Sequence, residues 1–210
     1  MYHFLREDRK LRFEPFTPVV VGGTLVYPGE PVLCEVGFHA SERAIDALKY
    51  APGPVLCIVE LSGEIIHGDD KAVAQERTVS WMQDISPTLH EFACQVAEEA
   101  LKEHGVTDER SWKAIEVKRL WLKGEATDEE LKDAWAAADA AASAARSAAA
   151  DAAWSAWFAA RSAAWYAAEA TAWYAAEAAA RSAARSAAGS AARSTQNEKL
   201  EAMIRRIYRS

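Results

Sequence analysis

The spacing of apolar residues along the chain changes at about residue 86. Before that position, short apolar and β-branched runs alternate with glycine and proline, and the runs cover residues 19–21, 24–27, 32–35 and 54–61. Short apolar runs between turn-forming residues are typical of β-strands. The pattern therefore predicts an antiparallel sheet within residues 1–84.

One short helix is expected inside this sheet region. Ala44, Ile45, Leu48 and Tyr50 recur at helical spacing and would form its apolar side. Ser41 precedes them and can accept a hydrogen bond from an amide of the first turn, as N-cap residues do. We therefore expect a helix that begins just after Ser41.

From residue 86 onward the apolar spacing is helical. Ser86 and Pro87 suit the N-cap and first position of a helix, and a second helix is expected over about residues 108–124. Thr127 and Glu130 then have the spacing of a capping box, in which a hydroxyl and a carboxylate each bind a backbone amide. The sequence predicts three consecutive helices here, the third beginning at Thr127.

Alanine makes up more than half of the chain between Thr127 and Gly189, and alanine is the best helix former. Over residues 157–194 an eight-residue pattern repeats, with an aromatic or basic position, two alanines and a charged residue. Eight residues turn a helix by roughly 80°, so the aromatic side chains would wind around it. We expect helices that break near residues 147–151 and Thr171 and pack into a bundle, with a dimer of long rods as the alternative.

A last helix is expected from Thr195, because Thr195 and Glu198 repeat the capping-box spacing and Leu200, Met203 and Ile204 follow at helical spacing. Together these elements predict an α+β fold. A small antiparallel-sheet module over residues 1–84 would precede an alanine-rich, all-helical domain over residues 85–210. The alanine-rich helices could also join copies of the chain into a homo-oligomer.

Composition supports a globular protein of 210 residues, half of them apolar, with a net charge of −7. The N-terminus has no apolar segment after its charged residues, and polar residues interrupt the long apolar runs. We therefore expect a cytoplasmic protein that does not span a membrane.

Cys34, Cys57 and Cys94 lie in separate apolar stretches, which favours reduced core cysteines over disulfides or a zinc site. No metal or cofactor is expected.

The C-terminal residues from 178 onward are mostly basic, although the whole chain is acidic. Such segregation can indicate an acidic partner or nucleic acid. We favour packing of this basic segment on acidic helices of the same chain, such as the one carrying Glu98, Glu99 and Glu103. The acidic overall balance and the lack of a recognised binding motif disfavour nucleic acid.

The first candidate for chemistry is His39, between an expected strand end and the expected helix. An imidazole there could bind a ligand or transfer a proton, but it could equally hold the turn by bonding backbone. Asp69, Asp70 and Lys71 follow the last apolar run of the sheet region. They could form an acid/base or cation site, although a solvated turn with a local ion pair is the simpler interpretation.

The aromatic residues of the repeat are the second group of candidates. They could stack on the rings of a ligand or dock a partner helix, and internal packing is the structural alternative. The members considered for a site are Trp157, Trp165, Tyr166 and Trp173.

Two stretches resemble known families. The GFHAS motif at residues 37–41, the strand VLCIVELSGEII and the pair Asp70 and Lys71 resemble an uncharacterised domain of phage and bacterial proteins, over about residues 1–80. The stretch from Trp112 to Ala142 is similar to an alanine-rich helical family labelled immunity proteins. This second resemblance implies a role in bacterial or phage conflict, and binding rather than turnover.

A third resemblance concerns the order GFHAS, alanine, tyrosine and then VLCIVELSG, which is similar to the core of ADP-ribosyltransferase-like folds. It implies that His3 and His39 face a nicotinamide nucleotide and that Phe38 stacks on it. The glutamate essential to such enzymes is not identifiable, and Glu60 and Glu64 are candidates by position alone.

We therefore expect a non-enzymatic binding protein of counter-defence or immunity type. It would bind a protein partner or a small nucleotide-like ligand where the sheet module meets the helices, because ligand pockets favour domain junctions. An NAD-using transferase and a purely structural, oligomer-forming protein are the alternatives. The expected ligand-binding residues are Phe38, His39, Ser41, Asp69, Asp70, Lys71 and the four aromatic residues of the repeat.

Overall fold

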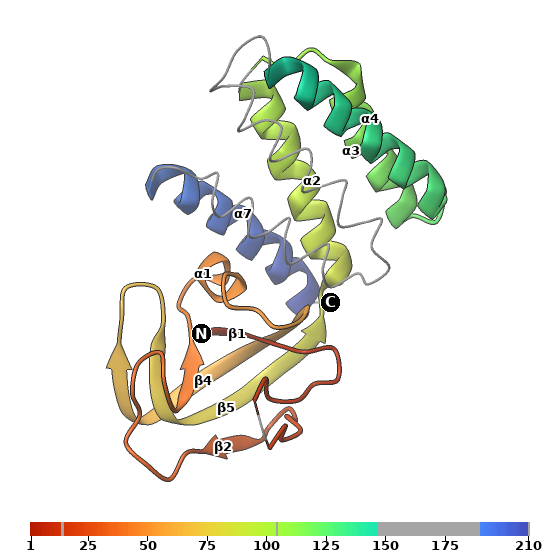
Figure 1. Ribbon diagram of the computed structural model, residues 1–210. Coiled ribbons are helices and arrows are strands. Elements are labelled where there is room, and N and C mark those ends of the chain that lie inside the picture. The colour runs from red at the N-terminus through yellow and green to blue at the C-terminus, as the bar shows by residue number, and fades with distance from the viewer. Residues whose placement is uncertain (14, 104, 147–189, 210) are drawn as a thin grey trace. The chain divides into compact units, whose positions relative to one another are not determined.

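The computed structural model describes residues 1–13, 15–103, 105–146 and 190–209, which are shown in Figure 1. The chain divides into two compact units, one of residues 1–85 with 200–210 and the other of residues 86–199. An antiparallel sheet precedes the long helices, so the predicted α+β fold is confirmed. The expected helix breaks at 147–151 and 171 lie outside the described residues.

The first unit contains a five-stranded sheet in which every pairing is antiparallel. Its centre is a long hairpin of two strands (Figure 1). Successive side chains along each of these strands point to opposite faces of the sheet. β1 pairs with the outer edge of β4, and β2 and β3 both pair with the outer edge of β5. The strands are β1 (Tyr2–Leu5), β2 (Thr24–Val26), β3 (Phe38–Ala40), β4 (Val55–His67) and β5 (Ala72–Asp84).

The strands β2 and β3 share one edge of β5, and this pairing determines which residues lie opposite each other. In β3, His39 lies opposite Val73, and in β2, Leu25 lies opposite Arg77. Gly37 makes the turn into β3 with φ at 102°, and a Cβ atom there would lie 2.8 Å from a methyl group of Val73. Only glycine suits a positive φ in so close an approach. The backbone geometry therefore explains why the first residue of the GFHAS motif is a glycine.

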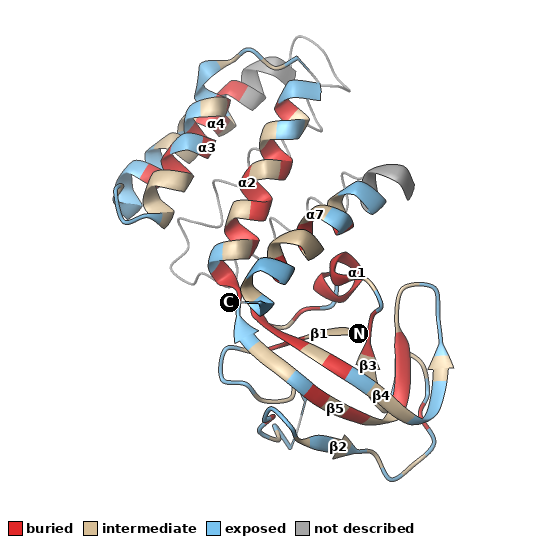
Figure 2. Cartoon of the chain, turned by 180° about the vertical axis from the view of Figure 1, so that it is seen from behind, coloured by how far each residue is buried: buried red, intermediate tan, exposed pale blue. Residues whose placement is uncertain are grey.

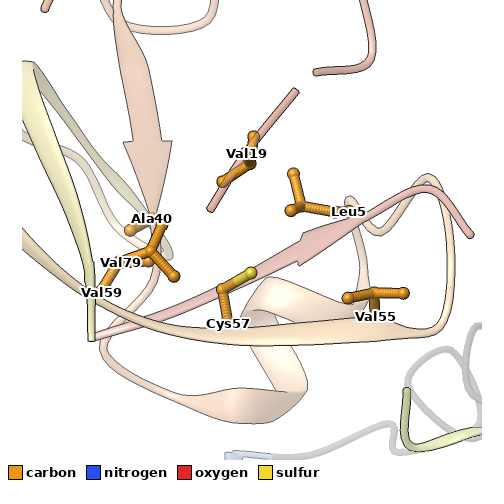
Figure 3. Close-up of a cluster of buried hydrophobic side chains, with 7 residues drawn as sticks. All are labelled: Leu5, Val19, Ala40, Val55, Cys57, Val59 and Val79. Atoms are coloured by element: carbon orange, nitrogen blue, oxygen red, sulfur yellow. The ribbon is translucent and has the colours of Figure 1, made fainter. Parts of the chain in front are cut away.

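The main core of this unit lies between the sheet and the loop that carries Val19 (Figure 3). The strands β1, β3, β4 and β5 contribute to it through small or branched residues, which suit a pleated and half-buried surface. All seven members are less than 5% exposed. They are Leu5, Val19, Ala40, Val55, Cys57, Val59 and Val79.

Several expected boundaries in the sheet region were wrong. Residues 19–21 and 32–35 form turns and an isolated bridge between Val32 and Val36 instead of strands. The bordering glycines and prolines leave each apolar run too short to pair with a neighbour. The short helix α1 (Ala44–Leu48) has Arg43 and not Ser41 at its N-cap, without a side-chain capping bond. The backbone of Ser41 instead exchanges hydrogen bonds with that of Tyr2.

The first three helices of the second unit begin close to their predicted positions, and the first two of them also end close to theirs. They are α2 (Ser86–Glu103), α3 (Glu109–Leu122) and α4 (Asp128–Arg146), and buried residues recur along α2 (Figure 2). The capping box is confirmed, because the Glu130 amide donates to the Thr127 hydroxyl at 3.2 Å and the Thr127 amide donates to the Glu130 carboxylate at 2.7 Å. None of the described helices is long and apolar enough to span a membrane.

The last helix, α7 (Ser190–Tyr208), already includes the five residues before the expected start at Thr195. Thr195 therefore lies inside it and does not cap it, because the alanines before it favour helix more strongly than the threonine favours a start. Leu200 and Ile204 are buried, as the apolar spacing predicts. Within the second unit, Lys199 forms an ion pair with Glu99 of α2, one instance of the expected contact between basic and acidic segments.

A buried lysine distinguishes the second unit. Lys118 on α3 is 1% exposed, and its ammonium lies 3.9 Å from the ring centroid of Trp121. Its Nζ has no hydrogen-bond partner among the described residues. Burial lowers the pKa of Lys118 to about 7, because desolvation penalises the charged form. The helical unit is therefore less stable when this lysine is protonated.

We expect Lys118→Met to raise the free energy of unfolding by roughly 1–3 kcal/mol near pH 6, since methionine keeps the volume without the charge. Between the folded pKa of about 7 and the usual value of 10.5, the unfolded chain binds the proton that the folded chain has lost. The stability of the wild type should therefore rise with pH across this window, and the advantage of the variant should shrink. Urea unfolding followed by circular dichroism at several pH values measures both.

The matched control is Lys113→Met, which removes an exposed ammonium from the same helix. It should change stability by less than about 0.5 kcal/mol at every pH. An advantage of Lys118→Met that is independent of pH would contradict the assignment.

Candidate functional site

A pocket of about 510 Å³ opens in the first unit, and all of its lining residues lie between Tyr2 and Arg77. Its walls come from β1, β3, β5 and the loops around residues 12, 35 and 50. Of the residues expected at a site, Phe38, His39, Ser41 and Lys71 line it. The volume lies within the range of small-molecule sites.

Arg77 of β5 is the most unusual residue in this pocket. It is 2% exposed, and its guanidinium donates one hydrogen bond of 2.9 Å to the backbone oxygen of His39. Its carbon Cζ lies 5.2 Å from the ring centroid of Phe38, in a cation–π contact. Within the described part of the chain, no carboxylate pairs with it and its Nε has no hydrogen-bond partner.

Burial lowers the pKa of Arg77 to about 10, through desolvation of the guanidinium. The side chain nevertheless remains charged at neutral pH, because even the lowered pKa lies well above 7. A buried cation without a counter-ion is costly, whereas a bound anion would remove much of that cost. Arg77 therefore favours a negatively charged group in this pocket.

His39 has the structural role weighed from the sequence, and it also lies at the wall of the pocket. Its Nε2 accepts a hydrogen bond of 3.0 Å from the backbone N–H of Cys34, so it holds a turn while its ring lines the pocket. Burial, Lys71 and Arg77 lower the pKa of His39, and a hydrogen bond with the backbone of Gly37 acts in the opposite direction. Because Nε2 accepts a bond, we infer a neutral ring with its proton on Nδ1.

His3 of β1 also lines the pocket, beside the segment that holds His39. Burial lowers the pKa of His3 well below its ordinary value, and the charges of Arg77 and His39 add to this effect. A hydrogen bond with the backbone of His39 opposes it only in part. Both histidines are therefore neutral at pH 7, and the positive charge of this wall comes from Arg77.

The segment after β4 forms a turn, as the simpler interpretation predicted, but the ion pair of Asp70 is made with the distant Lys49 and not with Lys71 of the same turn. The backbone N–H of Gly68 donates to the oxygen of Lys71 at 2.8 Å and closes the turn. Asp70 accepts hydrogen bonds from Lys49 at 2.6 Å and from the Tyr50 hydroxyl at 2.7 Å. Although burial alone would raise the pKa of Asp70, these two bonds lower it. Asp70 is thus an ionised anchor for Tyr50.

Asp69 and Asp70 do not line the large pocket. They line a smaller hollow of about 110 Å³ together with Lys71. The ammonium of Lys71 lies 3.9 Å from the ring centroid of Tyr50, and both residues also line the large pocket. Among the described residues, no group of three His, Cys, Asp or Glu side chains could hold a metal ion.

Sequence reasoning missed Arg77, Tyr50 and Cys34 as pocket residues. Cys34 is exposed and not a core residue, which corrects the expectation, whereas Cys57 and Cys94 are buried as expected. The alternation of β5 could have revealed Arg77, since it shares a face with the buried Val79 two residues later.

The aromatic candidates Trp157, Trp165, Tyr166 and Trp173 lie outside the described residues.

The possible transferase glutamates lie elsewhere. Neither Glu60 nor Glu64 lines the pocket, and among its described lining residues the one carboxylate is Glu35. His3, Phe38 and His39, however, do line one pocket.

Comparison with known proteins finds a family model that matches the sheet region but indicates no activity. Residues 1–91 match the family model described as "Domain of unknown function (DUF7666)". The expectation of an uncharacterised domain in the N-terminal part is thereby confirmed, and the match includes every residue that lines the large pocket. No curated protein and no solved structure matches the chain.

We expect His39 to titrate below pH 6.5 and His3 well below it, because both pKa values are lowered in the folded state. The unfolded chain then binds protons at a higher pH than the folded chain. The free energy of unfolding should therefore fall as the pH decreases below about 6.5. NMR titration of the imidazole Cε1–H signals, assigned with His39→Gln, measures both pKa values.

The same signals recorded in concentrated urea provide the reference. A midpoint for His39 at or above the urea value would contradict the buried, neutral ring.

Proposed function

We propose that residues 1–91 bind a small nucleotide-like anion, one that combines a planar ring with phosphate or carboxylate groups, in the pocket beside Arg77. The observation that carries this proposal is the buried guanidinium of Arg77 without a described carboxylate partner. Stability alone gives little reason for such a residue, whereas an anionic ligand would complete its bonds.

The rest of the pocket supports both parts of this ligand class. Arg12 and Lys71 also line it, so its described lining has three cationic side chains against the single carboxylate of Glu35. Aromatic rings surround the same space and could stack on a planar ring. These aromatic lining residues are Tyr2, Phe13, Tyr27, Phe38 and Tyr50.

In this proposal the protein binds its ligand and does not convert it. Both pocket histidines are neutral, and Nε2 of His39 is occupied by the amide of Cys34. The wider role that we propose, sequestration of such a ligand in phage and bacterial conflict, rests on the sequence resemblances alone.

Binding is tested by calorimetry and thermal shift with nucleoside mono-, di- and triphosphates, cyclic nucleotides and NAD. A ligand that binds only the folded protein adds about 2.7 kcal/mol of stability at 100 times its Kd. We expect Arg77→Met to weaken binding at least about 30-fold, as loss of a buried charge partner does. The same variant should change the melting temperature by less than about 5 °C, because it also removes a desolvated charge.

Arg77→Lys keeps the charge but not the planar fork and should lose less affinity than Arg77→Met. Arg6→Met removes an exposed guanidinium of the same unit that does not line the pocket and should bind normally. If nothing in the panel binds with Kd below about 1 mM, or if Arg77→Met binds like wild type, the proposal fails.

A second candidate function is NAD-dependent transfer, which the shared pocket of His3, Phe38 and His39 favours. Because neither Glu60 nor Glu64 lines the pocket, we favour ligand binding over NAD-dependent transfer. Incubation with NAD at high protein concentration, followed by mass analysis for free nicotinamide, decides between them. Release of nicotinamide that Phe38→Leu abolishes would replace the binding proposal with the transferase.

A further inference from the structure

The three cysteines of the chain lie in different environments. Cys57 and Cys94 are 0% exposed, and burial raises the pKa of each to about 12. Cys34 is exposed and lines the large pocket. Because a cysteine sulfur must reach its reagent to react, Cys34 is the cysteine whose exposure permits thiol chemistry in the folded protein.

Cys34 is also held in a defined position. Its φ is +71°, a left-handed conformation that residues other than glycine rarely adopt. Its backbone N–H donates a hydrogen bond of 3.0 Å to Nε2 of His39, and Lys71, whose charge interacts with Cys34, lines the same pocket. His39 therefore fixes the backbone of Cys34 at the wall of the pocket, which the ammonium-bearing Lys71 also lines.

The pocket that Cys34 lines independently favours an anionic ligand. Arg77 is 2% exposed, lines the same pocket, and has an Nε without a hydrogen-bond partner among the described residues. With Arg12 and Lys71 it gives the lining an excess of positive charge over Glu35. Such a field raises the local concentration of anionic reagents.

We propose that Cys34 is a modification site that forms a mixed disulfide with small anionic disulfides held in this pocket. The Cys34 thiol first loses its proton to solvent, and the thiolate attacks one sulfur of the reagent. A bond forms between the Cys34 Sγ atom and that sulfur while the S–S bond of the reagent breaks. The other half leaves as a thiolate with the electron pair, so Cys34 is oxidised and that half is reduced.

The test compares two aromatic disulfides of similar shape, the anionic dithiobis(nitrobenzoate) and the neutral dithiodipyridine, on the folded full-length chain. We expect one of the three thiols to react rapidly, and peptide mass mapping of the wild type should assign it to Cys34. Lys71→Met should slow the anionic reagent about 5-fold relative to the neutral one, the effect of one nearby unit charge. High salt should reduce the same ratio in the wild type.

Lys102→Met serves as the control, because it removes the same charge from an exposed site in the helical unit. Its ratio of rates should equal that of the wild type. Modification of Cys57 or Cys94 in the folded protein, or a ratio that Lys71→Met leaves unchanged, would overturn the proposal. Cys34→Ser, which should abolish the rapid phase, gives a second and independent check.

This inference does not require a nucleotide-like ligand. If such a ligand binds, it should protect Cys34 from the anionic disulfide. A failure of every nucleotide to bind, with the dependence on Lys71 intact, would remove the proposed function and leave the modification site standing.

Discussion

The pairing of β5 is the constraint on which the first unit depends. One edge of this strand pairs with β4, and the other is divided between β3 at residues 72–74 and β2 at residues 76–78. Two short segments that are distant in sequence are thereby fixed against one strand. The pocket exists because β3 brings Phe38 and His39 to the same place to which β1 brings His3.

Each unit buries a cation without a described carboxylate, and the two cations differ in how they can avoid the cost. Lys118 can give up its proton, because its pKa is lowered to about 7. Arg77 remains charged at any physiological pH, even with its pKa lowered to about 10. A structural explanation is therefore sufficient for the lysine, whereas for the arginine we propose a bound anion.

The same contacts serve the fold and the candidate site. The ring of His39 holds the backbone of Cys34, and the backbone oxygen of His39 accepts the bond from Arg77. Asp70 anchors Tyr50, and Lys71 lies over the Tyr50 ring. A ligand bound here would contact groups that are already positioned by other bonds, which lowers the entropy lost on binding.

The sequence by itself determined the helices of the second unit and the α+β class, because caps and helical spacing are local signals. The capping box at Thr127 and the helix from Ser86 needed no tertiary information. It also identified part of the pocket wall in Phe38, His39, Ser41 and Lys71, through motif resemblance and the chemistry of the side chains.

Only the tertiary structure decided the pairing of β5, the burial of Arg77 and the exposure of Cys34. Strand partners far apart in sequence leave no local pattern, so β1 and β3 were not identified as strands, and β5 (Ala72–Asp84) was missed as well. A cysteine in an apolar run is expected in a core, and only the left-handed turn at Cys34 directs it to the pocket. The environment of a side chain is a property of the assembled sheet, because burial and charge contacts arise between segments that the sequence keeps apart.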